Sequence, residues 1–133
     1  FFEDVPLSLP ALSHALKVQK KASQLKLDWP NSEGILEKIN EEARELWKAS
    51  ESKERIAVEE EFGDLLFSLV NLARKLDVDP ESSLDVAINK FKKRVSESIK
   101  IITREKIPHE QLTDDKLIEI WEQVKILLKK NDA

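Results

Sequence analysis

The chain has 133 residues, of which 41% are hydrophobic and 36% are charged, and its formal net charge is −4. This length predicts one domain with a sizeable hydrophobic core, and the small net charge provides no general attraction to nucleic acid. The absence of cysteine excludes disulfides, thiolate zinc sites and a cysteine nucleophile. No apolar run approaches the roughly 20 residues that a membrane-spanning helix needs. We therefore expect a cytoplasmic protein with no nucleic acid and no membrane as partners.

The composition predicts an all-α fold, because Leu, Ile, Ala, Glu and Lys dominate and only two glycines occur. Residues 1–9 are expected to form an extended lead-in, since Pro6 and Pro10 discourage a helix there. Asp79 is a predicted N-cap ahead of Pro80, and Thr113 is expected to cap the last helix. The expected helices cover residues 10–25, 32–52, 55–76, 80–103 and 113 onward. We predict a single domain over residues 1–133, built as a bundle of about five helices.

The chain begins with two phenylalanines and contains no methionine, which indicates a fragment of a longer protein. Its third helix is the most apolar, as expected for the central helix of a bundle. The residues predicted to face inward there are Val58, Phe62, Leu65, Leu66, Leu69, Ala73 and Leu76. Those predicted to face inward on the fourth helix are Leu84, Ile88, Phe91, Val95, Ile99 and Ile102. Gly63 lies within the third helix, where glycine is unfavourable, so we predict that a neighbouring backbone approaches it closely.

Two groups of carboxylates occur at helical spacing, the first on the second helix and the other on the third. Glu41, Glu42 and Glu45 form the first group, and Glu61 and Asp64 form the second. Side chains three or four positions apart project from the same side of a helix, and both groups flank the predicted apolar faces. If the two helices pack side by side, the acids converge, and such a cluster is costly unless a hard cation such as Mg²⁺ neutralises it. The alternative is that these acids are solvated surface charges.

A pair of cations follows on the fourth helix. Lys90 and Arg94 are four residues apart at the edge of its apolar face, with Asn89 beside them. Cations near a carboxylate-held metal ion complement a polyphosphate. They could equally form ion pairs with neighbouring acids.

The ordered motifs resemble the MazG family of nucleoside triphosphate pyrophosphohydrolases. The resemblance rests on EExxE at 41–45, EEFGDLLF at 60–67, NKFxxR at 89–94 and WExVK at 121–125. An opening segment with LPAL at 9–12, KVQKKA at 17–22 and Asp28-Trp29 also matches, so the likeness covers nearly the whole chain. It is greatest to the C-terminal catalytic half of two-domain members. One departure is Lys26-Leu27 where the family usually has Gly-Phe.

This resemblance implies an all-α enzyme that releases nucleoside monophosphate and pyrophosphate when a metal-activated water attacks the α-phosphorus. The implied Mg²⁺ ligands, with Mn²⁺ able to substitute, are Glu42, Glu45, Glu61 and Asp64. Either Glu41 or Glu45 would accept the proton, and Lys90 and Arg94 would act on the triphosphate. Further implied substrate contacts are Lys17, Lys20, Asn71 and Trp121. The last of them would lie near the base, and the alternative is that Trp121 is a core aromatic of the last helix. The family also implies a homodimer or higher homo-oligomer that completes the helical bundle.

Two other classes of protein share some of these features. A di-iron carboxylate bundle needs Glu-x-x-His motifs, and neither His14 nor His109 follows an acid at that spacing. A non-catalytic helical module that binds nucleotides or other proteins would explain the amphipathic helices. It would not explain why the acid groups and the cation pair occur together in this order.

Overall fold

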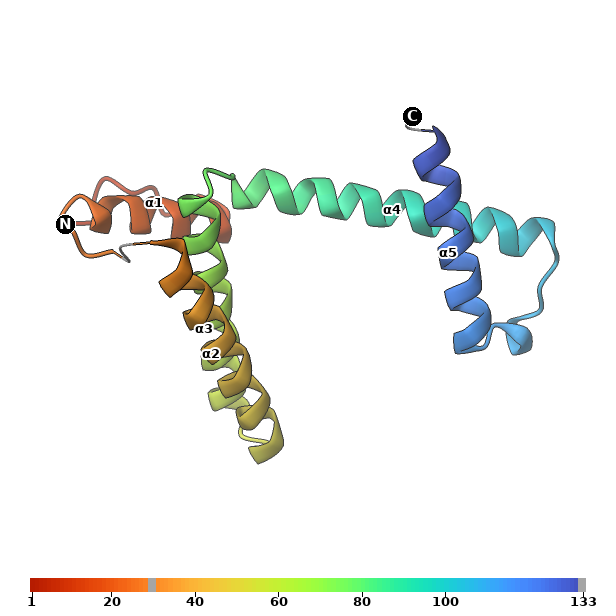
Figure 1. Cartoon of the computed structure of the whole chain (residues 1–133), viewed down its shortest axis with the longest axis horizontal. Coiled ribbons are helices and arrows are strands. Elements are labelled where there is room, and N and C mark those ends of the chain that lie inside the picture. Colours follow the sequence, from red (N-terminus) through yellow and green to blue (C-terminus); the bar gives the residue numbers. More distant parts are fainter. Residues whose placement is uncertain (29–30, 132–133) are drawn as a thin grey trace. The chain divides into compact units, whose positions relative to one another are not determined.

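The computed structural model describes residues 1–28 and 31–131. The helices are α1 (Ala11–Ser23), α2 (Ser32–Ser52), α3 (Arg55–Lys75), α4 (Pro80–Arg104) and α5 (Asp114–Asn131), with a short 3-10 helix, η1 (His109–Gln111), before α5 (Figure 1). No strand occurs in this part of the chain, so the predicted all-α class with five α-helices is confirmed. Trp29, which is part of the opening segment that matches the family, lies outside the described residues. None of the helices is long and apolar enough to cross a membrane.

Local capping explains where three of the helices begin. Asn31 caps α2, because its side-chain oxygen accepts a hydrogen bond of 2.9 Å from the amide of Gly34. The Oδ1 atom of Asp79 accepts from the amide of Glu81 at 2.9 Å, as predicted for the start of α4. Thr113 Oγ1 accepts from the amide of Lys116 at 3.3 Å at the start of α5. Each bond satisfies an amide that has no partner inside its own helix.

The chain divides into two compact units, residues 1–83 and 84–133, and the boundary falls within α4. The prediction of one domain over the whole chain stays a prediction. In the first unit α3 contacts both α1 and α2. Figure 1 shows α2 and α3 running side by side after a tight turn at Lys53, which has φ of 60°. The most deeply buried apolar side chains of this unit are Ile35 and Val70.

The apolar face predicted for α3 is only partly covered within its unit. Phe62, Leu66 and Leu69 expose 51%, 42% and 43% of their surface, so the prediction that they are buried is wrong for this single chain. The physical reason is that α1 and α2 cover only part of the circumference of α3. Leu65 and Ala73, by contrast, are half-buried.

The second unit is built on contacts between α4 and α5. Its core consists of Ile101, Ile120 and Val124. The partly buried residues packed against this core are Ile102, Ile107, Leu112 and Leu128. The predicted inward residues Leu84, Ile88, Phe91 and Ile99 of the fourth helix are exposed, although Phe91 contacts Trp121 of α5. Those four predictions are also wrong for the single chain, because one crossing helix cannot cover a face of this length.

The prediction for Gly63 is wrong as well. A Cβ atom built at this position would meet nothing within 4 Å among the described residues outside its own helix. Gly63 lies on an exposed part of α3, so no contact in this chain requires a glycine there.

Candidate metal and nucleotide sites

Three of the predicted acids meet between α2 and α3. One carboxylate oxygen from each of Glu42, Glu61 and Asp64 lies within 4.8 Å of the other two. Glu42 is contributed by α2 and is buried, whereas α3 supplies the half-buried Glu61 and the exposed Asp64. We call these three residues the acid group. Oxygen atoms this close from three carboxylates are suited to a hard divalent cation.

A lysine that the sequence analysis did not select lies against the acid group. Lys38 stands one turn before Glu42 on α2, and its Nζ atom is 2.7 Å from Glu42 Oε1. The same ammonium group is 3.9 Å from Glu41 Oε2. Hydrogen bonding to Glu42, followed by the charges of Glu42, Glu41 and Asp64, raises the pKa of Lys38 above its ordinary value. The sequence feature that could have identified Lys38 is its i, i+4 spacing from Glu42, which is typical of helical ion pairs.

Electrostatic coupling separates the pKa values of two members of the acid group. The hydrogen bond from Lys38 lowers the pKa of Glu42. Hydrogen bonding to Glu42, with repulsion from Asp64 and Glu45, raises the pKa of Glu61. Like charges held close together disfavour simultaneous ionisation, and a cation relieves this cost. A divalent cation held by these carboxylates would relieve the repulsion that raises the pKa of Glu61.

Glu41 and Glu45 lie outside the acid group. The Glu45 side chain is 46% exposed, and its Oε1 atom is 3.8 Å from Lys48 Nζ. Its charge nevertheless contributes to the raised pKa of Glu61, so it acts on the site electrostatically. Glu41 is more exposed and interacts with Lys38.

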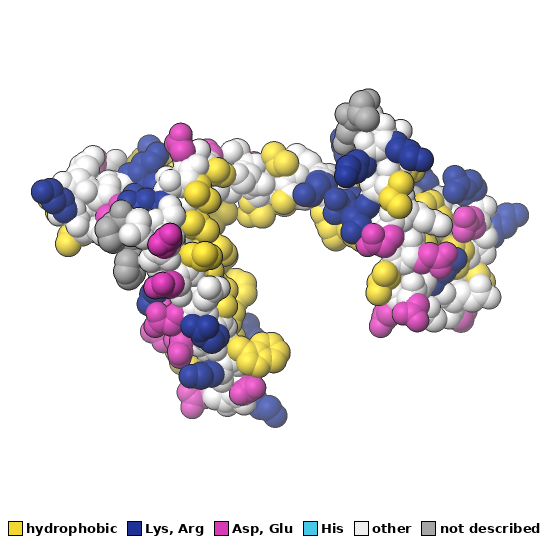
Figure 2. Space-filling view, in the orientation of Figure 1, with side chains coloured by type: hydrophobic (Ala, Val, Ile, Leu, Met, Phe, Trp, Pro, Cys, Tyr) yellow, Lys and Arg dark blue, Asp and Glu magenta, His cyan; other side chains and the backbone are white. Residues whose placement is uncertain are grey.

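The predicted cation pair lies in the second unit, where it lines a cavity of about 790 Å³ between α4 and α5. Lys90 and Arg94 are joined there by three lysines that the sequence analysis gave no role. We define the basic pocket by its cations Lys90, Lys93, Arg94, Lys125 and Lys129. Figure 2 shows dark-blue side chains gathered where α4 and α5 cross. The sequence feature that could have identified Lys125 and Lys129 is that they follow Trp121 at steps of four residues. This spacing places all three on one side of α5.

The ring of Trp121 contacts two residues of α4. Its centroid is 5.7 Å from that of Phe91, and the Arg94 guanidinium carbon lies 5.8 Å from it. The latter distance is within the range of a cation–π interaction, which favours this position of the Arg94 guanidinium in the basic pocket.

The remaining predicted substrate contacts lie on α1 and α3. Lys17 and Lys20 are exposed on α1 and line neither the basic pocket nor the acid group, within the part of the chain that the structure describes. Asn71 is half-buried on α3, where its Oδ1 atom accepts a hydrogen bond of 2.9 Å from Arg74.

Comparison with known families explains the combination of acids and cations. A family model described as the MazG nucleotide pyrophosphohydrolase domain matches residues 31–99. The chain belongs to the MazG family. The matched segment contains the whole acid group and the first cations of the basic pocket, so the predicted family is confirmed.

Individual MazG relatives are similar over most of this chain. The Thermotoga maritima nucleoside triphosphate pyrophosphohydrolase/pyrophosphatase MazG is 48% identical over 88% of this chain and 45% of its own length. The Escherichia coli K12 nucleoside triphosphate pyrophosphohydrolase is 36% identical over 92% of this chain and 48% of its own length. The chain thus spans less than half the length of these curated relatives.

Proposed function

We propose that this chain hydrolyses nucleoside triphosphates to nucleoside monophosphate and pyrophosphate with the help of Mg²⁺. The observation that carries the proposal is the convergence of Glu42, Glu61 and Asp64 within 4.8 Å. Membership of the MazG family supports the reaction class, and the names of the two relatives support the substrate class. The basic pocket supports a polyphosphate substrate.

The residues of the acid group fit a hard cation, because they offer oxygen donors only and already attract the ammonium group of Lys38. We propose Glu42, Glu61 and Asp64 as ligands of Mg²⁺ or Mn²⁺, with Glu45 joining from one turn along α2. Such an ion, when bound, supplies Lewis-acid polarisation of phosphate oxygens and lowers the pKa of water. The three carboxylates hold their oxygens close together before binding, which reduces the reorganisation that binding costs.

The reaction requires a nucleophile, a proton acceptor and neutralisation of the leaving group. A water oxygen forms the new bond to the α-phosphorus while the bond from that phosphorus to the bridging oxygen breaks. Glu41, or Glu45 through a carboxylate oxygen that the ion does not take, accepts the proton of the water, since both lie near the acid group. Lys90 and Arg94 neutralise charge on the pyrophosphate. Trp121 holds Arg94 in position, and its predicted place near the base stays a prediction.

The test is an assay of ribo- and deoxyribonucleoside triphosphates, with and without Mg²⁺, that separates pyrophosphate from orthophosphate. The proposal expects monophosphate and pyrophosphate in equal amounts, abolished by EDTA and by Glu42→Gln. The matched control is Glu51→Gln, because Glu51 is an exposed glutamate near the end of the same helix. Orthophosphate and diphosphate as products would show that a different bond breaks. Equal activity of Glu42→Gln and Glu51→Gln would contradict the proposed site.

We also propose that the substrate-competent form is a homodimer or larger homo-oligomer. The support is the exposed apolar surface of both units, which includes Phe62 and Leu66 on α3 and Ile88 and Phe91 on α4. Exposed apolar residues grouped along one helix face are typical of interaction surfaces. Sedimentation equilibrium should therefore give a multiple of 15.3 kDa. The variant Leu66→Asp should lower the mass toward that of one chain, and a wild-type monomer at all concentrations would refute this part of the proposal.

A further inference from the structure

A second pocket lies in the first unit, between α1 and α3. It has a volume of about 410 Å³, within the range of roughly 300–1,000 Å³ of pockets that hold small ligands. Its apolar wall includes Val18, Ala22 and Phe67. Its polar wall includes Gln19, Asn71 and Arg74, and we call it the Gln19 pocket. None of these six residues belongs to the acid group or to the basic pocket.

Gln19 carries a buried acceptor whose orientation is fixed. Its side chain is 5% exposed, and its Nε2 atom donates a hydrogen bond of 2.9 Å to the carbonyl oxygen of Phe67. Because Nε2 is held by Phe67, the Oε1 atom of the same amide group points away from that carbonyl. Oε1 has no hydrogen-bond partner among the described residues. A buried acceptor without a partner costs free energy, which a ligand that donates a hydrogen bond would recover.

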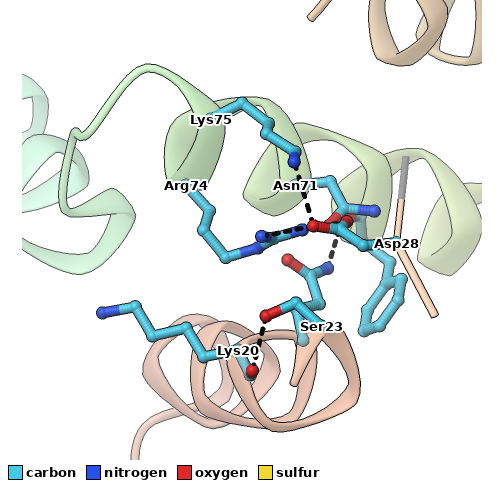
Figure 3. A network of polar contacts seen from close by, with 8 residues as sticks. Lys20, Ser23, Asp28, Asn71, Arg74 and Lys75 are labelled. Atoms are coloured by element: carbon cyan, nitrogen blue, oxygen red, sulfur yellow. Dashed lines mark hydrogen bonds and ion pairs between the residues drawn. The ribbon is translucent and has the colours of Figure 1, made fainter. Parts of the chain in front are cut away.

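Donors of fixed orientation lie on the α3 side of the pocket. Arg74 donates through Nη1 to Asp28 Oδ2 at 2.9 Å and through Nη2 to Asn71 Oδ1 at 2.9 Å, and Figure 3 shows this network. Because Asn71 accepts through Oδ1, its Nδ2 group is the end available to donate. The buried Nε atom of Arg74 has no acceptor in the described part of the chain. The pocket is thus lined by two residues that each hold a buried polar atom without a partner among the described residues, Gln19 and Arg74, and by the possible donor Asn71, beside apolar side chains.

The charges of the pocket favour a neutral ligand. Asp28 contributes a carboxylate to the lining and pairs with both Arg74 and Lys75, the latter at 3.0 Å. A phosphate would have to compete with this carboxylate for the same guanidinium group. A flat, neutral ring with N–H donors and acceptors on one edge has the chemistry to pair with these polar side chains, and it would not compete with Asp28 for the guanidinium group. The exposed face of Phe67 can stack on such a ring.

The third helix connects this pocket to the acid group. Asp64 and Asn71 are seven residues apart, so they lie on the same side of α3 with a separation of about 10.5 Å along its axis. The buried Ser68 lies between them on the same side. This arrangement is suited to a nucleotide that extends along the helix from its α-phosphate to its base.

We propose that the Gln19 pocket binds the nucleobase of the triphosphate, an inference that rests on the proposed function. Gln19 accepts a hydrogen bond from an N–H group on the edge of the base, and Asn71 donates one to a neighbouring acceptor. Phe67 stacks on the ring. These residues determine how strongly the site distinguishes one base from another.

The test compares Gln19→Met, which removes the acceptor at nearly the same size, with the matched control Gln24→Met at the exposed end of α1. Two substrates are used, the preferred nucleoside triphosphate and ribose 5-triphosphate, which has no base. We expect Gln19→Met to lower kcat/KM for the nucleotide by about tenfold or more and to leave the base-free substrate unchanged. Asn71→Leu should do the same, and Gln24→Met should change neither value.

Equal losses on both substrates would show a merely structural role and would overturn the inference, as would no loss on either. If the wild-type protein turns over no triphosphate at all, the proposed function fails, and the pocket is then tested by binding alone. The probe is a series of nucleoside 5′-monophosphates titrated into the Mg²⁺-loaded chain by NMR. Shifts of α1 and α3 amides that disappear in Gln19→Met would support the base site, and unchanged shifts would refute it.

Discussion

Lys38 and Glu42 form an ion pair of 2.7 Å one turn apart on α2, with the carboxylate buried and the ammonium group partly exposed. Asp64, on the neighbouring helix, also attracts this ammonium group and contributes to its raised pKa. The pair therefore compensates part of the negative charge where we propose that Mg²⁺ binds. Because it can leave the site by rotating into solvent, Lys38 is a reversible counter-ion for the metal-free state.

Addition of Mg²⁺ should stabilise the folded chain. A ligand that binds only the native state raises the free energy of unfolding by about 2.7 kcal/mol at a concentration one hundred times its Kd. Thermal unfolding followed by circular dichroism should thus show a higher Tm with MgCl₂ and none of this increase after EDTA. The increase should be strongly reduced in Asp64→Asn. A matched ionic strength of NaCl that gives the same shift would contradict specific binding.

Replacing Lys38 by Met should tighten metal binding, by about tenfold for a nearby unit charge that is partly screened. The same change should make the metal-free protein less stable, because Glu42 then keeps its acidic neighbours without a cation. Titration with Mn²⁺, followed by the EPR signal of the free ion, measures the affinity.

The matched control for this prediction is Lys100→Met. Lys100 also forms a helical ion pair of 2.7 Å, with Glu97, but it belongs to the other unit. The variant Lys100→Met should leave the Mn²⁺ affinity unchanged. An affinity that falls in Lys38→Met would show that the lysine supports the metal rather than competing with it.

The stability of the metal-free protein should depend on the ionisation of Glu61. Hydrogen bonding to Glu42, with repulsion from nearby acids, raises the pKa of Glu61 in the folded state. The folded chain therefore binds this proton more tightly than the unfolded chain does. Its contribution to stability is full below the ordinary glutamate pKa of about 4.3 and is lost as the pH rises through the raised value.

The variant Glu61→Gln has no ionisable group at this position, so its free energy of unfolding should not fall in this way as the pH rises. In urea unfolding with EDTA, the variant should equal the wild type at pH about 4 and be more stable at pH about 7. The lowered pKa of Glu42 makes the folded state more stable as the pH rises, and it does so in both proteins. The quantity to compare is therefore the difference in free energy of unfolding between the variant and the wild type. A difference that does not change with pH would refute the coupling.

Arg74→Met should destabilise the first unit. The side chains of Arg74 and Asp28 are only 11% and 15% exposed, and removing one partner of a largely buried pair leaves the other charge poorly compensated. We expect a loss of about 1–3 kcal/mol in the free energy of unfolding, below the usual cost because Lys75 still pairs with Asp28. Urea denaturation measures the loss.

The control is Arg55→Met, which breaks an ion pair of 3.0 Å with Glu59 at an exposed position. Exposed pairs of this kind contribute about 0.3–0.5 kcal/mol. Similar losses in Arg55→Met and Arg74→Met would mean that burial does not strengthen the Asp28 network.

Much of the local structure and the acid positions could be predicted from the order of the residues. Helix starts follow from caps such as Asp79, whose side chain bonds amides two and three residues on. The spacing of Glu61 and Asp64 places both on one side of α3, and the short turn at Lys53 folds α2 back so that Glu42 can reach them. These features depend on contacts over a few residues, which helical periodicity determines.

Only the tertiary structure decided which atoms meet. It joined Glu42, but not Glu45, to the α3 acids, and it brought Gln19 onto the carbonyl of Phe67, 48 residues away. It also showed that Phe62 and Phe91 stay exposed in one chain, although their spacing predicts a buried face. An apolar pattern specifies that a face requires cover and does not specify what supplies it. The partner of a side chain across two helices depends on their packing, which the periodicity of either helix alone does not contain.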